Sequence, residues 1–219
     1  MNFKELSGYS IDENTTCIQV SGEDSQKFLQ GQFSNDVTEL TDGIYQYSSY
    51  STNQGKVIAI FRILKNDQGY LLLLNTDVAK YFVDRLSMYI LMSKVVIEEQ
   101  KQYKVYGILG EPAENILSNN KLKENEYNKS SSKIILNNKN KYMPAVTIIK
   151  TKSNDSELNK LLQSIKNTSY NVNELVDNLL LLPRITMTMK ETYIPQVLNL
   201  EDLNGINYKK GCYTGQEIV

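Results

Sequence analysis

The chain has 219 residues, of which 41% are hydrophobic and 22% charged, as in an ordinary globular protein of one large domain or two small ones. With 24 Lys and Arg residues against 25 Asp and Glu residues, it has no overall electrostatic bias toward nucleic acid or anionic membranes. His is absent and Cys occurs only at Cys17 and Cys212. This excludes a Ser-His-Asp triad, a Cys-His dyad and the usual His-rich or four-cysteine metal centres, so we predict no metal site.

The N-terminal residues show no basic segment followed by an apolar stretch, so no signal peptide is indicated. The longest aliphatic runs, residues 71–74 and 179–182, are far shorter than the roughly 20 residues that cross a bilayer. Two distant Cys residues in such a chain favour reduced thiols over a disulfide framework. We therefore expect a cytoplasmic protein with no membrane partner.

The first hundred residues predict mostly strands joined by short turns. A strand at residues 16–21, with Cys17 in the core, precedes a short helix at residues 23–30 that Ser21 could cap and Gly31 could end. A meander of three strands follows, at residues 45–51, 57–64 and 70–74.

An amphipathic helix is predicted after this meander. It begins at the capping candidates Asn75 and Thr76 and extends to about Met92. Its apolar face consists of residues that recur at helical spacing, namely Val78, Tyr81, Phe82, Leu86, Tyr89 and Ile90.

The second half continues with strands at residues 94–98, 103–109 and 145–149 and a short helix opened by Pro112. Residues 119–140 are dominated by Asn, Lys, Ser and Glu, so we interpret them as a solvated surface excursion with at most one edge strand. Two further helices are expected, one after the capping candidates at residues 153–155 and one at residues 173–182, before Pro183. The grouped strands and singly inserted helices favour an α+β fold with mainly antiparallel sheets.

After Pro183 the pattern is irregular, and such long stretches are usually functional or disordered. Residues 209–217 read KKGCYTGQE. Lys209 and Lys210 favour the thiolate form of Cys212, and the two glycines of the segment let a ligand approach the main chain. The alternative is a glycine-rich turn in which Cys212 fills a small pocket.

This segment closely resembles the signature of the YgfZ family of folate-binding proteins, relatives of the T-protein (aminomethyltransferase) of the glycine cleavage system. FLQGQFSNDV at residues 28–37 resembles the first motif of the family, and STNQGKVIAIFRIL at residues 51–64 resembles the second, with Gly55, Lys56 and Arg62 in the expected places. The three motifs follow the family order and span most of the chain.

The resemblance implies an aminomethyltransferase-like body over residues 1–219 with a central cavity for tetrahydrofolate or a derivative. We expect two intertwined subdomains, the second at roughly residues 95–170. In the family a C-terminal β-barrel follows the Cys motif, so we expect that a chain ending at Val219 lacks it.

The resemblance also assigns candidate site residues. Cys212 is the functional thiol, with redox exchange among its candidate roles, and we expect the three motifs to converge on one cavity. Arg62 or Arg184 could bind the folate glutamate tail or form structural ion pairs. The candidate folate or motif residues are Gln32, Asn35, Asp36, Lys56, Arg62, Lys210, Tyr213, Gln216 and Glu217.

One departure from the family concerns aromatic stacking. Some members use two Trp residues around folate, whereas this chain has no Trp. Thr15 and Leu180 stand near the corresponding positions, and neither can stack on a pterin. The 15 Tyr residues could supply that surface instead.

The resemblance implies a function in assembly or repair of iron-sulfur enzymes, including those that thiolate tRNA. The expected partners are folate and iron-sulfur proteins or their assembly factors, and the lack of a basic stripe argues against direct binding of tRNA or DNA. The alternative is a tetrahydrofolate-dependent aminomethyltransferase. Its catalytic Asp lies in a segment resembling Gly-Gly-Val-Ile-Asp-Asp, where this chain has Ala59 and Ile60, which cannot accept a proton. Asp36 is the nearest motif carboxylate, and it also fits a turn or a helix cap.

Overall fold

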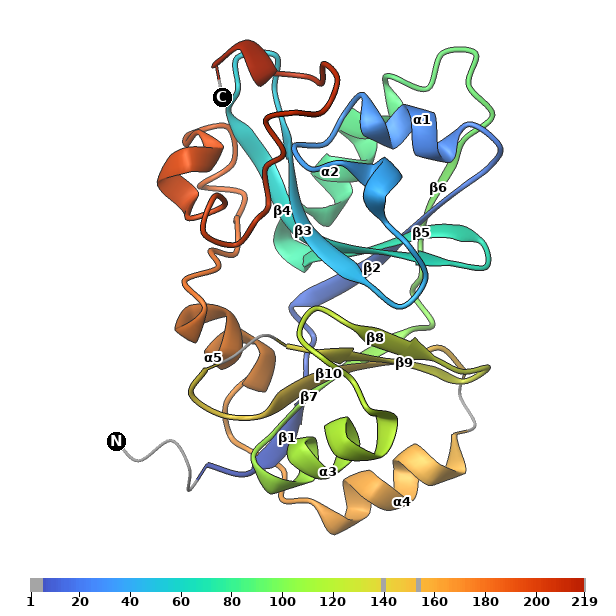
Figure 1. Cartoon of the computed structure of the whole chain (residues 1–219), viewed down its shortest axis with the longest axis vertical. Coiled ribbons are helices and arrows are strands. Elements are labelled where there is room, and N and C mark those ends of the chain that lie inside the picture. Colours follow the sequence, from blue (N-terminus) through green and yellow to red (C-terminus); the bar gives the residue numbers. More distant parts are fainter. Residues whose placement is uncertain (1–5, 139–140, 153–154, 219) are drawn as a thin grey trace. The chain divides into compact units, whose positions relative to one another are not determined.

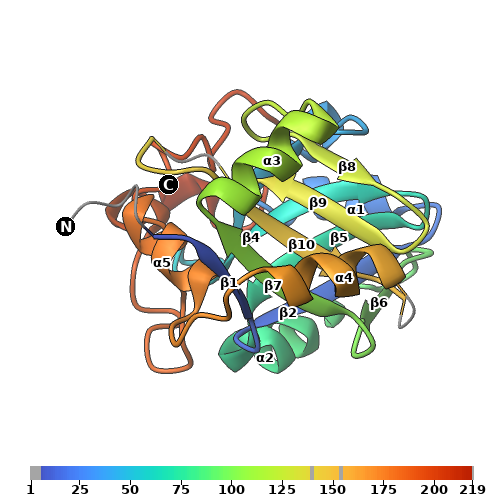
Figure 2. The same cartoon turned by 90° about the horizontal axis from the view of Figure 1, so that it is seen from below.

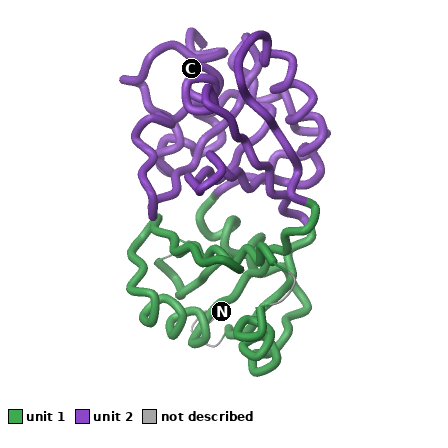
Figure 3. Tube along the Cα trace, turned by 90° about the vertical axis from the view of Figure 1, so that its right-hand side faces the viewer, with its two compact units in different colours: residues 1–13, 101–181 green, residues 14–100, 182–219 purple. Residues whose placement is uncertain are grey.

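The computed structural model describes residues 6–138, 141–152 and 155–218. The chain forms two compact units that alternate along the sequence (Figure 3). Unit 1 comprises Met1–Glu13 and Lys101–Leu181, and unit 2 comprises Asn14–Gln100 and Leu182–Val219. Each unit contains an antiparallel five-stranded sheet with a few helices, so the expected α+β fold is confirmed.

The sheet of unit 2 has the strand order β3-β4-β5-β2-β6, with β3 and β6 at its edges. All its neighbouring strands are antiparallel, which agrees with the meander expected from the sequence. The strands are β2 (Thr15–Ser21), β3 (Tyr45–Ser51), β4 (Val57–Asn66), β5 (Gly69–Asn75) and β6 (Val96–Glu99).

Two helices pack with this sheet, α1 (Ser25–Gln30) and α2 (Thr76–Ser87). The Phe82 ring of α2 lies 5.7 Å from the Phe61 ring of β4, which in turn lies 4.6 Å from the Phe33 ring. These side chains are buried and form an aromatic core between the helices and one face of the sheet.

Both helices differ from their predicted ends. α1 begins at Ser25 rather than at residue 23, and Ser21 is not its cap because Ser21 ends β2, where it pairs with Val96. The cap of α2 is Asn75 as expected, but this helix ends at Ser87 rather than near Met92. Beyond it the chain makes tight turns with bonds to the third preceding carbonyl, and Met92 is 98% exposed. The helical spacing of the apolar residues therefore continues beyond the end of the helix itself.

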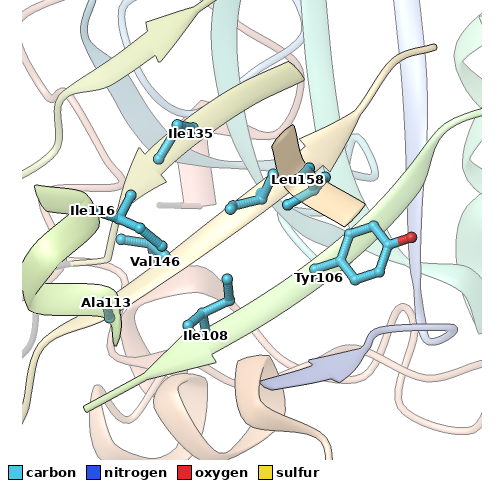
Figure 4. Packing of buried hydrophobic residues seen from close by; sticks show 8 residues of the cluster. Tyr106, Ile108, Ala113, Ile116, Ile135, Val146 and Leu158 are labelled. Atoms are coloured by element: carbon cyan, nitrogen blue, oxygen red, sulfur yellow. The ribbon is translucent and has the colours of Figure 1, made fainter. Parts of the chain in front are cut away.

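The sheet of unit 1 has the order β1-β7-β10-β9-β8. Helices α3 (Glu111–Asn120) and α4 (Ser156–Ser164) lie against one face of this sheet (Figure 2), and α5 (Val172–Leu179) also belongs to the unit. Figure 4 shows the core between them, where Ile108, Val146 and Leu158 meet. The strands are β1 (Gly8–Ile11), β7 (Lys104–Leu109), β8 (Tyr127–Lys129), β9 (Lys133–Asn137) and β10 (Ala145–Lys150).

The interpretation of residues 119–140 as a solvated excursion with at most one edge strand is wrong for residues 127–137. β8 and β9 form a hairpin in it, and β9 lies inside the sheet between β8 and β10. The run of Ile134, Ile135 and Leu136 is buried, because these apolar residues suffice for a central strand while the polar residues fall in the turns. Residues 139 and 140 lie outside the described residues.

Two other predictions for unit 1 need small changes, and β1 was not predicted. Of the capping candidates at residues 153–155, Asp155 caps α4 by accepting a hydrogen bond from the Leu158 amide, and the first two lie outside the described residues. The last helix ends at Leu179 instead of residue 182, since Leu181 adopts the left-handed conformation.

The C-terminal segment of unit 2 is irregular apart from two 3-10 turns, η3 (Pro195–Leu198) and η4 (Gln216–Ile218). It attaches to β4, because the Val57 amide donates to the Tyr193 carbonyl at 2.8 Å and the Glu191 amide donates to the Val57 carbonyl at 2.7 Å. Figure 1 shows the end of this segment beside the turn that joins β3 and β4. None of the helices in the described part of the chain has the length and apolar character that crossing a bilayer requires.

Candidate functional site

The first motif lies along the outer edge of β3. The Ser34 amide donates to the Ser49 carbonyl at 3.0 Å, and the Ser49 amide donates to Ser34 Oγ at 2.8 Å. Asn35 Nδ2 donates to the Tyr47 carbonyl at 2.9 Å. The motif thus provides hydrogen-bond partners to backbone groups of an edge strand that would otherwise face solvent.

The C-terminal segment in turn binds the first motif. Asn35 Nδ2 also donates to the Asn204 carbonyl, and Ser34 Oγ donates to the Gly205 carbonyl, each at 2.7 Å. The Asn207 amide donates to the Ser34 carbonyl at 3.0 Å. Two adjacent residues of the first motif therefore connect β3 to residues about 170 positions later in the chain.

The segment that follows Cys212 is held in the same way. The Thr214 amide donates to the Gly31 carbonyl at 3.2 Å, and Thr214 Oγ1 lies 3.2 Å from Gln32 Oε1, to which it donates. Gln216 closes the turn locally, since its Oε1 accepts from the Tyr213 amide at 3.3 Å. The candidates Gln32, Tyr213 and Gln216 are thus brought into one region.

Lys210 makes the most extensive of these links. Its ammonium donates to the backbone carbonyls of Gln30, Phe33 and Asn35 at 2.8, 2.6 and 2.9 Å. The side chain is only 8% exposed, and burial lowers the pKa of Lys210 to about 8, while the negative charge of Asp36 opposes the shift. All three N–H bonds of the ammonium are used within the protein, so Lys210 joins the motifs instead of presenting its charge to a ligand.

The second motif meets the third at two glycines. Gly55 and Gly215 both have positive φ angles, +70° and +84°. A Cβ on Gly215 would lie 2.4 Å from the Thr52 carbonyl oxygen and 2.9 Å from Gly55 Cα, so only glycine fits there. Lys56 lies in this turn, where its amide donates to Thr52 Oγ1 at 3.2 Å. The three motifs therefore meet in unit 2 as expected, and the cavity expected between them remains a prediction.

The two cysteines have opposite environments. Cys17 is buried in β2, at 3% exposure, whereas Cys212 is exposed, and within the described residues neither forms a disulfide. Gly211 has open space around it, with no atom within 4 Å of an added Cβ. Glu217 is exposed in η4. The Cys212 thiol is therefore presented to solvent by a loop whose neighbouring residues Lys210 and Tyr213 are buried.

A second group of candidates lies on β3 and β4. Arg62 is 6% exposed, and its guanidinium carbon lies 5.3 Å from the ring centroid of Tyr47, its partner on the adjacent strand. The hydroxyls of Tyr47 and Tyr213 are buried and have no hydrogen-bond partner among the described residues. Arg184 donates to Thr15 Oγ1 of β2 at 3.3 Å.

Asp36 acts as a cap. It precedes the 3-10 turn η2 (Val37–Glu39), and its Oδ1 accepts from the Thr38 amide at 2.9 Å. Partial burial works against ionisation, but hydrogen bonds from Thr38 and Gln30 and the charge of Lys210 hold the pKa of the Asp36 carboxyl below its usual value. The cap role considered from the sequence is thus the one that Asp36 has.

Some residues of this network were not singled out from the sequence. Ser34 belongs to the first motif, but its sequence position alone does not indicate its role, and Asn204 and Gly205 lie in a stretch without a recognisable pattern. Asn207 accepts from the amides of Lys209 and Lys210 at 2.9 and 3.1 Å, a local Asx arrangement that its position before the two lysines could have suggested. Within the described residues, no group of three or more Cys, Asp or Glu side chains is placed to hold a metal ion.

No family model matches the chain. A tRNA-modifying protein YgfZ from Buchnera aphidicola is 30% identical over 227 residues, which cover all of this chain and 70% of that relative. The chain belongs to the YgfZ family. Two further proteins named tRNA-modifying protein YgfZ, from Colwellia psychrerythraea and Photobacterium profundum, are 28% identical over 92% of this chain, which covers 63% and 61% of their lengths. The chain thus spans less than the whole of these YgfZ proteins.

The fold of this YgfZ chain is shared with an enzyme of the glycine cleavage system. A crystal structure of glycine cleavage system aminomethyltransferase T from Bartonella henselae matches with a TM-score of 0.75 over 99% of this chain and 63% of that protein. The sequence identity is 13%, so the match establishes the fold alone. The family and the fold class expected from the three motifs are both confirmed.

Proposed function

We propose that this protein supports iron-sulfur-dependent modification of tRNA through the thiol of Cys212, and that unit 2 binds a reduced folate. The observation that carries the proposal is the exposed thiol of Cys212 on a loop that is fixed to the first motif on both sides. A Cys that serves packing alone would be buried, as Cys17 is. The similar YgfZ proteins from Buchnera aphidicola and Colwellia psychrerythraea are named tRNA-modifying proteins, which supports the same function.

The chemistry of one thiol limits what Cys212 can do alone. Iron-sulfur clusters normally have four protein ligands, and Cys212 supplies one. Cys212 therefore acts together with a partner, an iron-sulfur protein or one of its assembly factors. We place this function in the cytoplasm, where exposed thiols stay reduced.

Unit 2 contains the types of side chain that bind a folate. The buried guanidinium of Arg62 can bind a carboxylate of the glutamate tail, and the unpaired hydroxyls of Tyr47 and Tyr213 can accept or donate hydrogen bonds to a polar ligand. The Tyr rings offer a stacking surface in place of Trp. Further polar groups come from Gln32, Lys56, Gln216 and Glu217 of the motifs.

Calorimetry with tetrahydrofolate tests this part. We expect binding by the wild type, and weaker binding by Tyr47→Phe, which removes only the unpaired hydroxyl. Tyr170→Phe, which removes the hydroxyl of an exposed residue of unit 1, serves as a matched control that keeps wild-type affinity. Absence of binding heat in the wild type would contradict folate binding.

The alternative, aminomethyl transfer, lacks a suitable carboxylate at the positions of the second motif. Ala59 and Ile60 are buried within β4, where neither can orient an amine or move a proton. The carboxylate of Asp36 is engaged as the cap of η2. We therefore expect no methylene transfer to an aminomethyl carrier, and sustained turnover in that assay would restore the alternative.

The thiol part is tested in cells that lack their own YgfZ protein. The natural gene, its Cys212→Ala variant and its Cys17→Ala variant are compared by mass spectrometry of thiolated tRNA nucleosides. We expect the Cys212→Ala variant to leave the nucleosides at the level of the deletion strain, while Cys17→Ala restores them. Full restoration by Cys212→Ala would overturn the assignment.

A further inference from the structure

We propose that Lys210 is the positioning residue of the Cys212 loop (residues 210–214), which its side chain attaches to carbonyls at the last residue of α1 and shortly after it. The inference deepens the proposed function and rests on it, because it assumes that Cys212 is the working thiol. Lys210 acts through the loop, since its ammonium is directed into the first motif.

The donors of Lys210 and the acceptors around it match one to one. A lysine ammonium has three N–H bonds, and three carbonyl oxygens, of Gln30, Phe33 and Asn35, lie within 2.9 Å of it. The last carbonyls of a helix have no partner within the helix, and α1 ends at Gln30. A cation at a helix C-terminus is also favoured by the helix dipole.

The loop is held again directly after Cys212. The ring centroid of Tyr213 lies 4.9 Å from the Lys210 ammonium, and the Thr214 amide donates to the Gly31 carbonyl at 3.2 Å. Gly31 directly follows α1, so both sides of Cys212 are attached to the same short stretch of the first motif.

The spacing of these attachments restricts the thiol. Only Gly211 and Cys212 lie between the buried residues Lys210 and Tyr213. Consecutive Cα atoms are about 3.8 Å apart, so the arc that carries the thiol is short and cannot move far while both ends are held. With open space around Gly211, the anchors, and not local packing, set where the thiol lies.

The test compares Lys210→Met with Lys209→Met. Both variants remove one positive charge from the loop, but Lys209 is exposed and only its amide, which the substitution keeps, makes a bond in the network. Hydrogen exchange of the segment 211–216 is measured by mass spectrometry, with tRNA thiolation in cells as the functional readout. We expect at least tenfold faster exchange and loss of thiolation in Lys210→Met, and wild-type exchange of the segment in Lys209→Met.

Chemical rescue separates the ammonium from the bulk of the side chain. In Lys210→Ala, added propylammonium can donate to the three carbonyls, whereas tetramethylammonium has the charge but no N–H bond. We expect propylammonium alone to restore slow exchange of the segment 211–216. Labelling of Cys17, buried in β2 of the same unit, reports whether a variant has unfolded as a whole.

The outcomes separate the two proposals. Wild-type exchange in Lys210→Met overturns the role of Lys210. Labelling of Cys17 in Lys210→Met under native conditions would mean that the variant has unfolded, and the rescue experiment with Lys210→Ala then decides. Failure of propylammonium to restore slow exchange there overturns the positioning role of Lys210. If Cys212→Ala keeps tRNA thiolation, the proposed function falls, while the exchange experiments still decide whether Lys210 positions the loop.

Discussion

Replacing Gly215 by Ala should detach the second motif from the Cys212 loop. Gly215 has a φ angle of +84°, where residues with a Cβ are strained. The added Cβ would lie 2.4 Å from the Thr52 carbonyl oxygen and 2.9 Å from Gly55 Cα. Both are backbone atoms, so they cannot rotate away as a flexible side chain would.

The expected magnitude follows from these two effects. The left-handed conformation costs about 1 kcal/mol for an alanine, and overpacking against fixed atoms adds about 1–3 kcal/mol. We therefore expect Gly215→Ala to lower the free energy of unfolding of unit 2 by about 2–4 kcal/mol. Gly211→Ala is the matched control, since its φ is not positive and its added Cβ meets nothing within 4 Å. It should change stability by less than about 1 kcal/mol, through the entropy of the unfolded chain.

The assay is urea unfolding followed by the reactivity of the Cys17 thiol, which is buried in unit 2 until that unit opens. The free energy of unfolding falls linearly with urea concentration, so the two variants are compared by their midpoints and slopes. Equal midpoints for Gly215→Ala and Gly211→Ala would refute the argument from the close approach of Gly215 to Thr52 and Gly55.

Four further substitutions test separate features of unit 2. Burial lowers the pKa of Lys210 to about 8 in the folded protein, against about 10.5 in the unfolded chain. Between these pH values the unfolded chain binds one more proton, so the free energy of unfolding of the wild type should rise with pH relative to that of Lys210→Met. Denaturant titrations should show a rise of at most about 3 kcal/mol. Asn35→Ala removes donors to the carbonyls of Tyr47 and Asn204 and should cost about 2–3 kcal/mol in urea unfolding, with an effect below 1 kcal/mol contradicting the anchoring role. Because the pKa of Asp36 is lowered by folding, its stabilisation is present above about pH 4 and lost as the pH falls through the folded value, so acid should destabilise the wild type more than Asp36→Asn. Cys17→Ala should cost about 1 kcal/mol and keep function, which thermal unfolding and tRNA thiolation would check.

Turn residues between apolar runs made the sheet of unit 2 predictable. The strands around Tyr47 and Arg62 were placed from their sequence to within two residues, because each strand is bounded by turn residues. The end of α2 was not, because Tyr89 and Ile90 continue the helical spacing after the backbone has turned away. Helical periodicity shows which residues could share one face of a helix. The end of the helix depends on how far the sheet extends to cover that face.

The hairpin of β8 and β9 shows a different limit. Average composition over residues 119–140 is polar, yet three consecutive apolar residues, Ile134, Ile135 and Leu136, are enough to complete a sheet when β10 offers a hydrogen-bonding edge. That edge belongs to residues later in the chain. Local composition therefore could not reveal it.

The role of Lys210 could not be predicted from the sequence for a related reason. Its position beside Cys212 suggested an effect on the thiol or on a ligand, but its ammonium binds carbonyls up to 180 residues away. Main-chain carbonyls occur at every residue, so no residue type marks these acceptors. The family resemblance located the motifs, and only the three-dimensional arrangement shows what each side chain of them does.

The interleaving of the two units has a consequence for synthesis. Asn35 and Asn204 are 169 residues apart, so at roughly 5–20 residues per second a ribosome needs about 10–30 s to make the second after the first. During that time the first motif lacks the donors and acceptors of residues 204–214, and all of Lys101–Leu181 is made in between. Unit 2 starts at Asn14, before most of unit 1, and is completed only after Leu181, the last residue of unit 1, which makes its early segments a natural client for chaperones on the nascent chain.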